Sequence, residues 1–305
     1  MKKPLLTVAS LVEEHDLEVL FAPGPLENIF IKNNNVDRNG MKLMGFTSTH
    51  NPERLHLMGN MEKGYLENLS EAERDKSIKN FFECGTAGLI ITNNNPCDPL
   101  ILENAKAYNV VVLRTSLPTS EYTYNYYYYT AKYYAPTVTM HGVLVEVHGE
   151  GTLIIGDSSI GKSEVAIGLI MQGHRLVADD SVEIKLMPDK RLIGYPLPMT
   201  YGFTELRGLG IINIQALYGM AAMQSKTKIT SVVHLVPWNN EDKYERLGLE
   251  EEKIEILGIA IPKITLPVRA GRNLTAIIEA HAVNQRAKRK GYNAVIELDQ
   301  RREGH

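Results

Sequence analysis

The sequence is poor in cysteine, has no long apolar segment and carries almost no net charge. Its two cysteines, Cys84 and Cys97, are too few for a disulfide scaffold, and their single spacing matches no metal-binding motif, so we expect two reduced thiols. No apolar run reaches the ~18 residues that a membrane-spanning helix needs. The stretch after Lys2 and Lys3 is too short and too polar for a signal peptide. These absences predict a soluble, cytoplasmic protein with no membrane partner.

The charge is nearly balanced, with 33 basic and 36 acidic side chains and a formal net charge of -3. This balance excludes a globally basic nucleic-acid-binding protein and a strongly acidic disordered tail. The net negative charge comes from residues 1–135, which carry 13 basic and 16 acidic side chains, whereas residues 136–305 carry 20 of each. We therefore expect no nucleic-acid partner.

The first half of the chain alternates β-type runs with helical patterns, which predicts an α/β domain with a parallel sheet. The expected strands are Leu17–Ala22, Leu43–Thr47, Gly88–Thr92 and Val110–Arg114, and the expected helices are Ser70–Glu83 and Pro99–Tyr108. Ser70, with Glu73 three residues later, fits a capping box at a helix start. This half contains no phosphate-binding glycine pattern and no catalytic constellation, so its role stays open.

Eight of the fifteen tyrosines lie within residues 121–136. A base-stacking platform is conceivable, but Lys132 is the segment's only basic residue. A helix or strand that packs aromatic faces between two domains is the better interpretation. A chain of 305 residues is long enough for two domains, and we place an N-terminal α/β domain at 1–132 and a second domain at 133–305, with Pro136 closing the segment.

The second half begins with a predicted hairpin of residues 143–147 and 152–155, whose second strand leads into a glycine-rich loop. A short helix should follow over residues 165–170 and end near Gly173. The remaining expectations are strands at 175–178, 182–186 and 229–236 and a long helix at Leu274–Arg289.

The loop fits the pattern G-x-x-x-x-G-K-[ST], and a β-run precedes it while a helix follows, which is the setting of a P-loop. Its residues are Gly156, Asp157, Ser158, Ser159, Ile160, Gly161, Lys162 and Ser163. Glycines at both ends let the backbone wrap round a phosphate with its N–H groups aimed inward, and the helix N-terminus adds positive charge. Lys162 should reach the β- and γ-phosphates, and the Ser163 hydroxyl should ligate Mg²⁺.

Further polar residues stand where they can face the phosphates. Asp179 and Asp180 close an apolar strand, and adjacent strand residues point to opposite sides, so one of them should face inward. The segment Thr204–Asn213 contains Arg-Gly-x-Gly, which indicates a tight backbone, although a structural turn explains it equally well. A lone His-Gly pair at His141 is more often structural.

Taken together, these motifs identify a family. The sequence resembles bacterial HPr kinase/phosphorylase, densely over about 133–290 and only loosely over the first 130 residues. The motifs that carry the resemblance, in order and spacing, are Met140–Val145, Gly156–Glu164, Gly173–Asp180, Glu205–Asn213, Glu245–Gly248, Ile261–Ile264 and Pro267–Asn273.

The resemblance implies a bifunctional enzyme that phosphorylates a serine of the phosphocarrier protein HPr with ATP or pyrophosphate. It also implies the reverse process, in which inorganic phosphate removes the seryl phosphate and pyrophosphate leaves. The resemblance further implies Mg²⁺ (or Mn²⁺) as the metal cofactor, a bacterial cytoplasmic location, a role in carbon catabolite repression and a homohexamer. It also implies a P-loop domain of the phosphoenolpyruvate-carboxykinase-like type.

The resemblance also implies residue roles. Asp180 matches the residue that takes the serine proton and returns one in the reverse direction, and Asp179 supports it; Lys162 matches the P-loop lysine. Ser163 and Glu205 match metal positions. Two further active-site positions are His141 and Arg246. Supporting positions are Arg207, Gly208, Gly210 and Asn213, and the loop tied to dephosphorylation comprises Pro267, Val268, Arg269, Ala270, Gly271 and Arg272.

The chain departs from the family at two points, and two other functions stay open. Many members have Gly where Ser159 stands, so a positive φ there would strain this chain. The tyrosine-rich segment replaces a more usual aliphatic helix. The alternatives are a carboxykinase-like P-loop enzyme acting on a small substrate and a non-catalytic nucleotide-sensing regulator.

Overall fold

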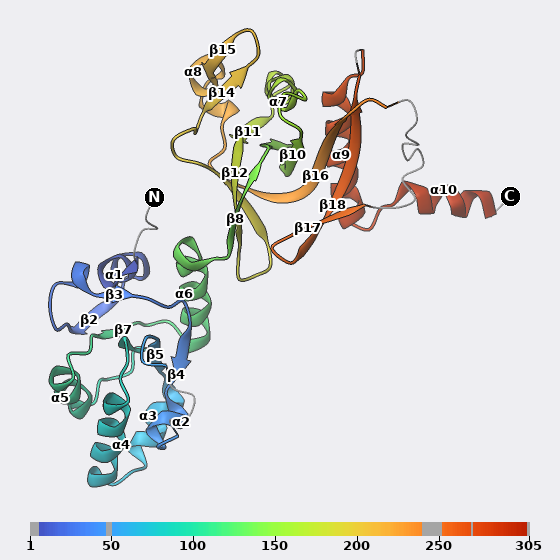
Figure 1. Ribbon diagram of the computed structural model, residues 1–305. Helices are drawn as coiled ribbons and strands as arrows, with labels where there is room; N and C mark the ends of the chain where they lie inside the picture. Colours follow the sequence, from blue (N-terminus) through green and yellow to red (C-terminus); the bar gives the residue numbers. More distant parts are fainter. Residues whose placement is uncertain (1–5, 47–50, 240–251, 270, 304–305) are drawn as a thin grey trace. The chain divides into compact units, whose positions relative to one another are not determined.

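The computed structural model of the chain describes residues 6–46, 51–239, 252–269 and 271–303. The chain divides into two compact units, Met1–Ala135 and Pro136–His305 (Figure 1). Within the described ranges, no helix has the length and apolar character needed to cross a bilayer.

The first unit is built on a five-stranded sheet. Its strand order is β2 (Glu18–Phe21), β7 (Val112–Arg114), β6 (Gly88–Ile91), β5 (Leu55–Met58) and β4 (Val36–Arg38). The four strands from β4 to β7 run parallel, and β2 alone is antiparallel to its neighbour. The predicted parallel α/β sheet is therefore confirmed. A separate two-stranded pair joins β1 (Leu6–Thr7) to β3 (Phe30–Ile31).

Helices cover both faces of this sheet because successive strand residues point to opposite sides. Ile90 joins the core under α1 and α6, whereas Leu89 and Ile91 join the core under α4 and α5. The helical elements are α1 (Val8–His15), η1 (Leu26–Asn28), α2 (Gly40–Leu43), α3 (Asn60–Glu67), α4 (Glu71–Glu83), α5 (Pro99–Ala107) and α6 (Thr119–Tyr134).

One predicted strand of this unit is wrong, and four strands, β1, β3, β4 and β5, were not predicted. Residues 40–43 form the short helix α2, and Thr47 lies outside the described residues. The strand is β5, Leu55–Met58, which starts twelve residues later. The first error arises because periodicity alone does not distinguish a strand from a helix in a short apolar run. β5 was missed because the buried His56 interrupts its apolar pattern. The capping box is confirmed: Ser70 Oγ accepts from the Glu73 N–H, and the Glu73 carboxylate accepts from the Ser70 N–H.

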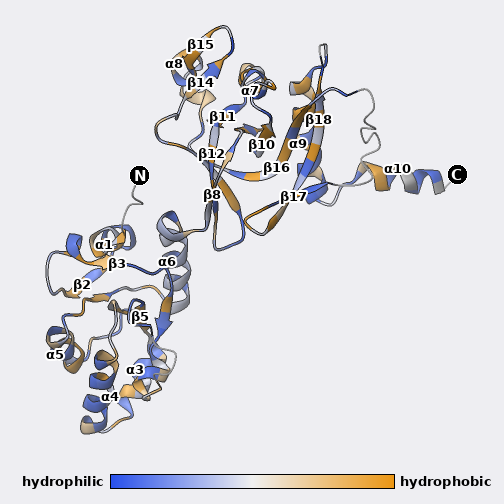
Figure 2. Ribbon diagram, viewed as in Figure 1, coloured by the Kyte–Doolittle hydropathy of each residue, from blue (hydrophilic) through white to orange (hydrophobic). Residues whose placement is uncertain are grey.

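The tyrosine-rich segment forms α6, and its buried face belongs to the first unit's own core. The sequence predicted packed aromatic faces, and the buried rings pack within the first unit. Tyr122, Tyr126 and Tyr129 are buried and recur at helical spacing. Tyr126 donates a hydrogen bond to the Asn33 carbonyl at 2.8 Å, and Tyr129 donates one to the Ser10 carbonyl at 3.1 Å. The helix is pale in Figure 2 because tyrosine lies near the middle of the hydropathy scale. Its rings fill the core, while the hydroxyls of Tyr126, Tyr129 and Tyr134 donate to backbone carbonyls.

The second unit contains a nine-stranded sheet centred on β16 (Thr227–Pro237). On one side of β16 lie β10 (Glu150–Gly156), β9 (Val143–Val147) and β11 (Arg175–Ala178). The start of β16 pairs with β13 (Leu192–Pro196), which leads to β12 (Ser181–Leu186) and β8 (Thr137–His141). The rest of β16 pairs in parallel with β18 (Ile259–Val268), and β18 pairs with β17 (Lys253–Ile256).

Two helices, α7 (Lys162–Met171) and α9 (Leu274–Arg289), pack on one face of this sheet and share its core with β9, β10 and β16. Strand residues alone make up the other core cluster. The remaining elements are the hairpin β14 (Phe203–Leu206) and β15 (Gly210–Asn213), then α8 (Ile214–Tyr218), η2 (Met220–Ala222) and α10 (Ala294–Glu303). The predicted hairpin before the P-loop and the long helix at Leu274–Arg289 are both confirmed.

Candidate active site

The glycine-rich loop connects β10 to α7, with β10 running parallel to β16 beside it. Two glycines make this path possible. Gly156 has φ 150°, and a Cβ there would lie 2.5 Å from the Leu235 carbonyl oxygen. Gly161, which precedes the first helical residue, has φ 102°. A side chain at the first position would collide with β16, and one at the second would be strained, so the loop needs both glycines.

Lys162 is folded onto its own loop. Its Nζ donates to the carbonyl oxygens of Gly156 and Asp157, at 2.9 and 2.8 Å, and the residue is only 7% exposed. These carbonyls fix the ammonium group at the loop, close to the N-terminus of α7, where backbone N–H groups also concentrate positive charge. The combination is suited to binding an anion such as a phosphate.

Ser159 lies at the point of the loop where the left-handed backbone conformation is required. Its φ is 65°, a region that non-glycine residues enter at a cost. Ser159 therefore has the positive φ, and with it the backbone strain, that the comparison with glycine-containing family members led us to expect.

The two aspartates form a tight turn between β11 and β12. The Ser181 N–H donates to the Asp179 carbonyl at 2.8 Å, with Asp180 between them at φ 67°. A three-residue turn with a positive central φ is the rare, strained form. Strain at such a residue costs on the order of 1–3 kcal/mol and must be supported by the surrounding structure. Here Gly142 N–H supplies support by donating to the Asp180 carbonyl at 3.0 Å.

The side chains of the two aspartates have different surroundings. Asp179 is 5% exposed, and its Oδ1 accepts from the Ser163 hydroxyl at 3.1 Å and from the Asp180 N–H at 2.8 Å. Burial raises the pKa of Asp179, although these hydrogen bonds act in the opposite direction. The Asp180 carboxylate is 73% exposed and lies 3.2 Å from His141 Nδ1. One carboxylate is thus held against the loop serine, and the other is free to meet a second reactant.

His141 reaches Asp180 because β8 and β12 pair antiparallel. Ser181, the residue after Asp180, is the direct partner of His141 in that ladder. The prediction that His141 lies near the aspartates rests on the resemblance alone, since His141 and Asp180 are thirty-nine positions apart and meet here through strand pairing.

A cavity of about 640 Å³ joins these groups to the β14–β15 hairpin. Glu205 of β14, Arg207 and Gly208 of the turn, and Gly210 of β15 line it from the hairpin. The other predicted residues in its wall are His141, Ser158, Ser159, Gly161, Lys162, Ser163, Asp179 and Asp180. The fold therefore brings the loop, the aspartate turn and the hairpin to one place.

Other predicted residues lie elsewhere. Asn213 caps α8, where its side chain accepts from the Ala216 N–H at 2.9 Å, and it does not line the cavity. Within Pro267–Arg272, Arg269 stacks over the Trp238 ring at 5.0 Å, and Arg272 donates to the Pro267 carbonyl. None of the described residues of that loop lines the cavity. Arg246 and Ala270 lie outside the described residues.

The structure adds cavity residues that the sequence had not singled out as site residues. They are Glu164, Thr200, Phe203, Thr204, Leu206 and Ile211. Most come from the β14–β15 hairpin, where the consecutive residues Phe203 to Leu206 all line the cavity. Nothing in the sequence indicated that this hairpin would pack against a P-loop.

The donor atoms in the cavity suit a hard divalent cation. Ser163 offers a hydroxyl, and Asp179, Asp180 and Glu205 offer carboxylates, which are the oxygen ligands that Mg²⁺ prefers. Lys162 and Arg207 supply fixed positive charge in the same wall. Carboxylates beside a phosphate-binding loop repel a polyphosphate unless a cation lies between them, so the arrangement fits a metal–nucleotide ligand and phosphoryl transfer.

Comparison with known proteins agrees with this geometry. The model of the HPr Serine kinase C-terminal domain matches residues 132–302, and that of the HPr Serine kinase N terminus matches residues 6–130. The chain belongs to the HPr serine kinase family. Within this family, both units of the chain are accounted for, including the first unit, which has no catalytic pattern of its own.

Curated relatives within the HPr serine kinase family match over nearly the whole chain. The HPr kinase/phosphorylase of Caldicellulosiruptor bescii is 38% identical over 97% of this chain and 95% of its own length. That of Listeria monocytogenes is 41% identical over 97% and 94%. A solved structure of the Hpr(Ser) kinase/phosphatase from Coxiella burnetii is 32% identical, covers 53% of this chain and 98% of its own, and has a TM-score of 0.47.

Proposed function

We propose that this protein phosphorylates a serine of HPr, with ATP or pyrophosphate as donor, and removes that phosphate with inorganic phosphate as acceptor. The observation that supports it best is the exposed Asp180 carboxylate, held on a strained turn in the wall of a P-loop cavity. The names of the relatives point to the same two activities.

In the kinase direction, the P-loop and Lys162 hold the donor phosphates while Asp180 accepts the proton of the incoming serine hydroxyl. The serine oxygen attacks the terminal phosphorus, and the bond to the leaving phosphate breaks. His141, 3.2 Å from Asp180, orients the carboxylate. A divalent cation held by Ser163 and Glu205 would neutralise charge on the phosphates.

In the reverse direction, inorganic phosphate attacks the phosphorus of the seryl phosphate. The P–O bond to serine breaks, protonated Asp180 gives its proton to the serine oxygen, and pyrophosphate leaves. One carboxylate serves both directions because the reverse path must pass through the same proton positions as the forward path.

The hairpin beside the cavity supports a protein substrate. Leu209 is 68% exposed and Ile211, which lines the cavity, is 74% exposed. A small polar metabolite would gain nothing from apolar side chains at this place, whereas a folded protein that delivers a serine can cover them.

The proposal includes Mg²⁺ as the cation, a bacterial cytoplasmic location and a homohexamer. From the resemblance, Arg269 and Arg272 are proposed to hold the second phosphate of the reverse reaction, and Arg246 is proposed to neutralise phosphate charge. Ultracentrifugation of the purified protein tests the hexamer by its mass.

The deciding experiment mixes the purified protein with HPr, Mg²⁺ and γ-labelled ATP, and follows label on seryl residues of HPr. We expect labelling, which Lys162→Met should reduce at least a hundredfold while the far-ultraviolet circular dichroism spectrum stays unchanged. Addition of inorganic phosphate to phosphorylated HPr should then release pyrophosphate.

Absence of seryl phosphate, with an active relative as control, would refute the proposal. Nucleotide binding without turnover would favour a regulator, and release of carbon dioxide from oxaloacetate would favour a carboxykinase-like enzyme.

A further inference from the structure

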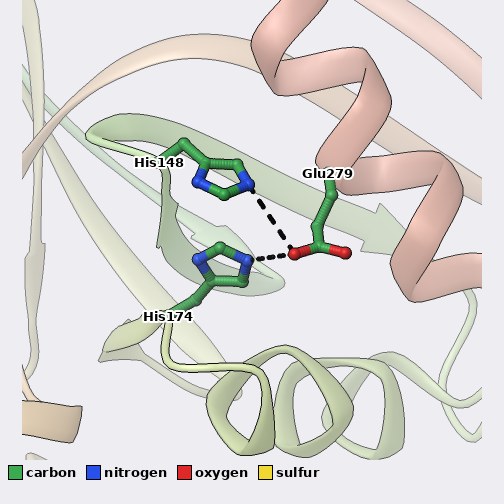
Figure 3. Close-up of side chains that lie close together, drawn as sticks. All are labelled: His148, His174 and Glu279. Carbon is green, nitrogen blue, oxygen red and sulfur yellow. Dashed lines mark hydrogen bonds and ion pairs between the residues drawn. The ribbon is translucent and has the colours of Figure 1, made fainter.

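Two histidines and a glutamate meet in the second unit, away from the P-loop (Figure 3). His148 lies in the β9–β10 turn, His174 follows α7, and Glu279 lies on α9. His174 Nε2 is 2.8 Å from Glu279 Oε1, and His148 Nε2 is 3.7 Å from the same oxygen. Both rings therefore direct the same kind of nitrogen at one carboxylate.

The spacing of the three groups suits a transition-metal ion. One ligand atom from each residue lies within 4.8 Å of the others. In a tetrahedral zinc site with bonds of about 2.0–2.1 Å, ligand atoms lie about 3.3–3.4 Å apart, and the observed 2.8 and 3.7 Å fall on either side of that value. We propose that His148, His174 and Glu279 bind one Zn²⁺ ion.

The position of His148 in its turn supports a role beyond local structure. His148 and Gly149 have φ values of 51° and 82° and connect the paired residues Val147 and Glu150. Two positive φ values in a two-residue hairpin loop define a type I′ turn, for which Asn-Gly is strongly preferred. The chain therefore accepts a less favourable residue at the one turn position that places an imidazole beside His174 and Glu279.

The surroundings leave room for a fourth ligand. A cavity of about 470 Å³ is lined by His148, Glu279, Asn284 and Tyr292, among others. Three protein ligands with an open side are typical of zinc sites in which water completes the coordination. The buried His174, at 6% exposed, supplies a fixed ligand, and the exposed His148 closes the site from the solvent side.

The three residues come from the β9–β10 turn, the segment after α7, and α9, all in the unit that contains the P-loop. A bound ion would hold α9 to the β9–β10 turn and to the end of α7. The loop residues Lys162 and Ser163 lie at the beginning of α7, and a helix of ten residues is about 15 Å long. The ion would thus stabilise the scaffold without entering the catalytic cavity.

The test is metal binding by the full-length protein after chelator treatment, measured by calorimetry with Zn²⁺ in excess Mg²⁺. Co²⁺ serves as a spectroscopic probe, because tetrahedral Co²⁺ with nitrogen ligands absorbs visible light strongly. We expect one Zn²⁺ per chain, an intense Co²⁺ spectrum that Zn²⁺ abolishes, and a higher Tm with Zn²⁺.

His148→Asn is the sharpest variant, because it installs the preferred Asn-Gly turn while removing a ligand. Its metal-free Tm should equal or exceed that of the unchanged chain, whereas Zn²⁺ affinity should fall at least tenfold and the Zn²⁺-dependent rise in Tm should disappear. Glu279→Gln, which keeps an oxygen acceptor for His174, should weaken binding likewise. His234→Asn is the control, because His234 pairs with Ile155 at the P-loop end of β10. This variant should leave the Zn²⁺ affinity and the Zn²⁺-dependent rise in Tm unchanged.

Zn²⁺ binding that is equally tight and equal in stoichiometry in His148→Asn would overturn the proposal, because the ion would then occupy another site. Failure of the unchanged chain to bind Zn²⁺ at micromolar concentration would overturn it as well. Neither result depends on kinase activity, so the proposal stands or falls separately from the HPr reaction.

Discussion

The charged cluster around Asp37 in the first unit and the candidate site in the second unit use charged side chains in opposite ways. In the first unit, Asp37 accepts from Lys42 at 3.2 Å and from Arg54 at 2.8 Å, so each charge has a partner inside the fold. In the candidate site of the second unit, Lys162 Nζ donates to two loop carbonyls, and the exposed Asp180 carboxylate lies beside His141. Charges paired internally stabilise a fold, whereas charges kept without an opposite charge are available to a ligand.

Backbone strain in the second unit extends into the candidate site. In the first unit, the non-glycine residues with positive φ are Asp16, Asn93, Asn94 and Asn109, among the described residues. Asn and Asp tolerate this conformation in ordinary turns. In the second unit, Ser159 and Asp180 adopt it in the cavity wall, whereas His148, Lys190 and Leu257 adopt it in turns between strands. Strain that coincides with the candidate site indicates that geometry for chemistry is maintained there at the expense of stability.

The largest effect is expected from Asp180→Asn. The amide fits the same turn, but it cannot accept the serine proton, so phosphorylation of HPr should fall on the order of 10²–10⁴-fold. ATP affinity and Tm should stay nearly unchanged. Rapid-quench assays and calorimetry measure the two quantities. A variant with full activity would remove Asp180 from the mechanism and erase the contrast between the two units.

Asp37→Asn should have the opposite effect: the first unit should lose stability, while the rate of HPr phosphorylation should stay unchanged. Lys42 is only 9% exposed in its side chain, and the variant leaves it without its carboxylate partner. Because removal of one member of a buried ion pair is strongly destabilising, we expect a loss of about 2–3 kcal/mol in the first unit at neutral pH. Urea denaturation measures this loss.

The same pair gives a pH dependence with a defined sign. Burial by itself would raise the pKa of Asp37, but hydrogen bonds from Arg54 and Lys42 outweigh it and lower the pKa below its usual value of 3.8. The stabilisation is therefore present above about pH 4 and is lost as the pH falls through the folded-state pKa. The difference between Asp37→Asn and the unchanged chain should shrink on acidification. A difference that is constant down to pH 3 would contradict this account.

The sequence predicted some of these features and not others, for physical reasons. Local signals sufficed for the P-loop, for the capping box at Ser70 and for the helix Leu274–Arg289, because glycine geometry and periodicity act over few residues. They failed for β5, whose single buried histidine breaks the apolar pattern. The meeting of His141 with Asp180 depends on strand register, and the wall formed by the β14–β15 hairpin depends on packing. Only a related sequence pattern or the folded structure supplies these.

A smaller effect separates two neighbouring tyrosines of α6. Tyr126→Phe leaves the Asn33 carbonyl without its donor, and we expect a loss of about 1 kcal/mol. Tyr122→Phe is the matched control, because the Tyr122 hydroxyl is buried without a hydrogen-bond partner. Its removal should leave stability unchanged or increase it. Chemical denaturation of both variants measures the difference, and equal losses would show that the hydroxyls play no part in fixing α6.

The smallest effect is expected at Ser159. Glycine relieves the positive φ of 65° at this position, but it also gives the unfolded chain more freedom, so Ser159→Gly should gain only about 0.5 kcal/mol in stability. Ser158→Gly is the control, because its φ is not positive and the variant should lose a similar amount. ATP affinity, measured by calorimetry, should rise in the first variant alone. If both serines respond alike, the strain at Ser159 does not bear on nucleotide binding, and the coincidence of strain and chemistry would rest on Asp180 by itself.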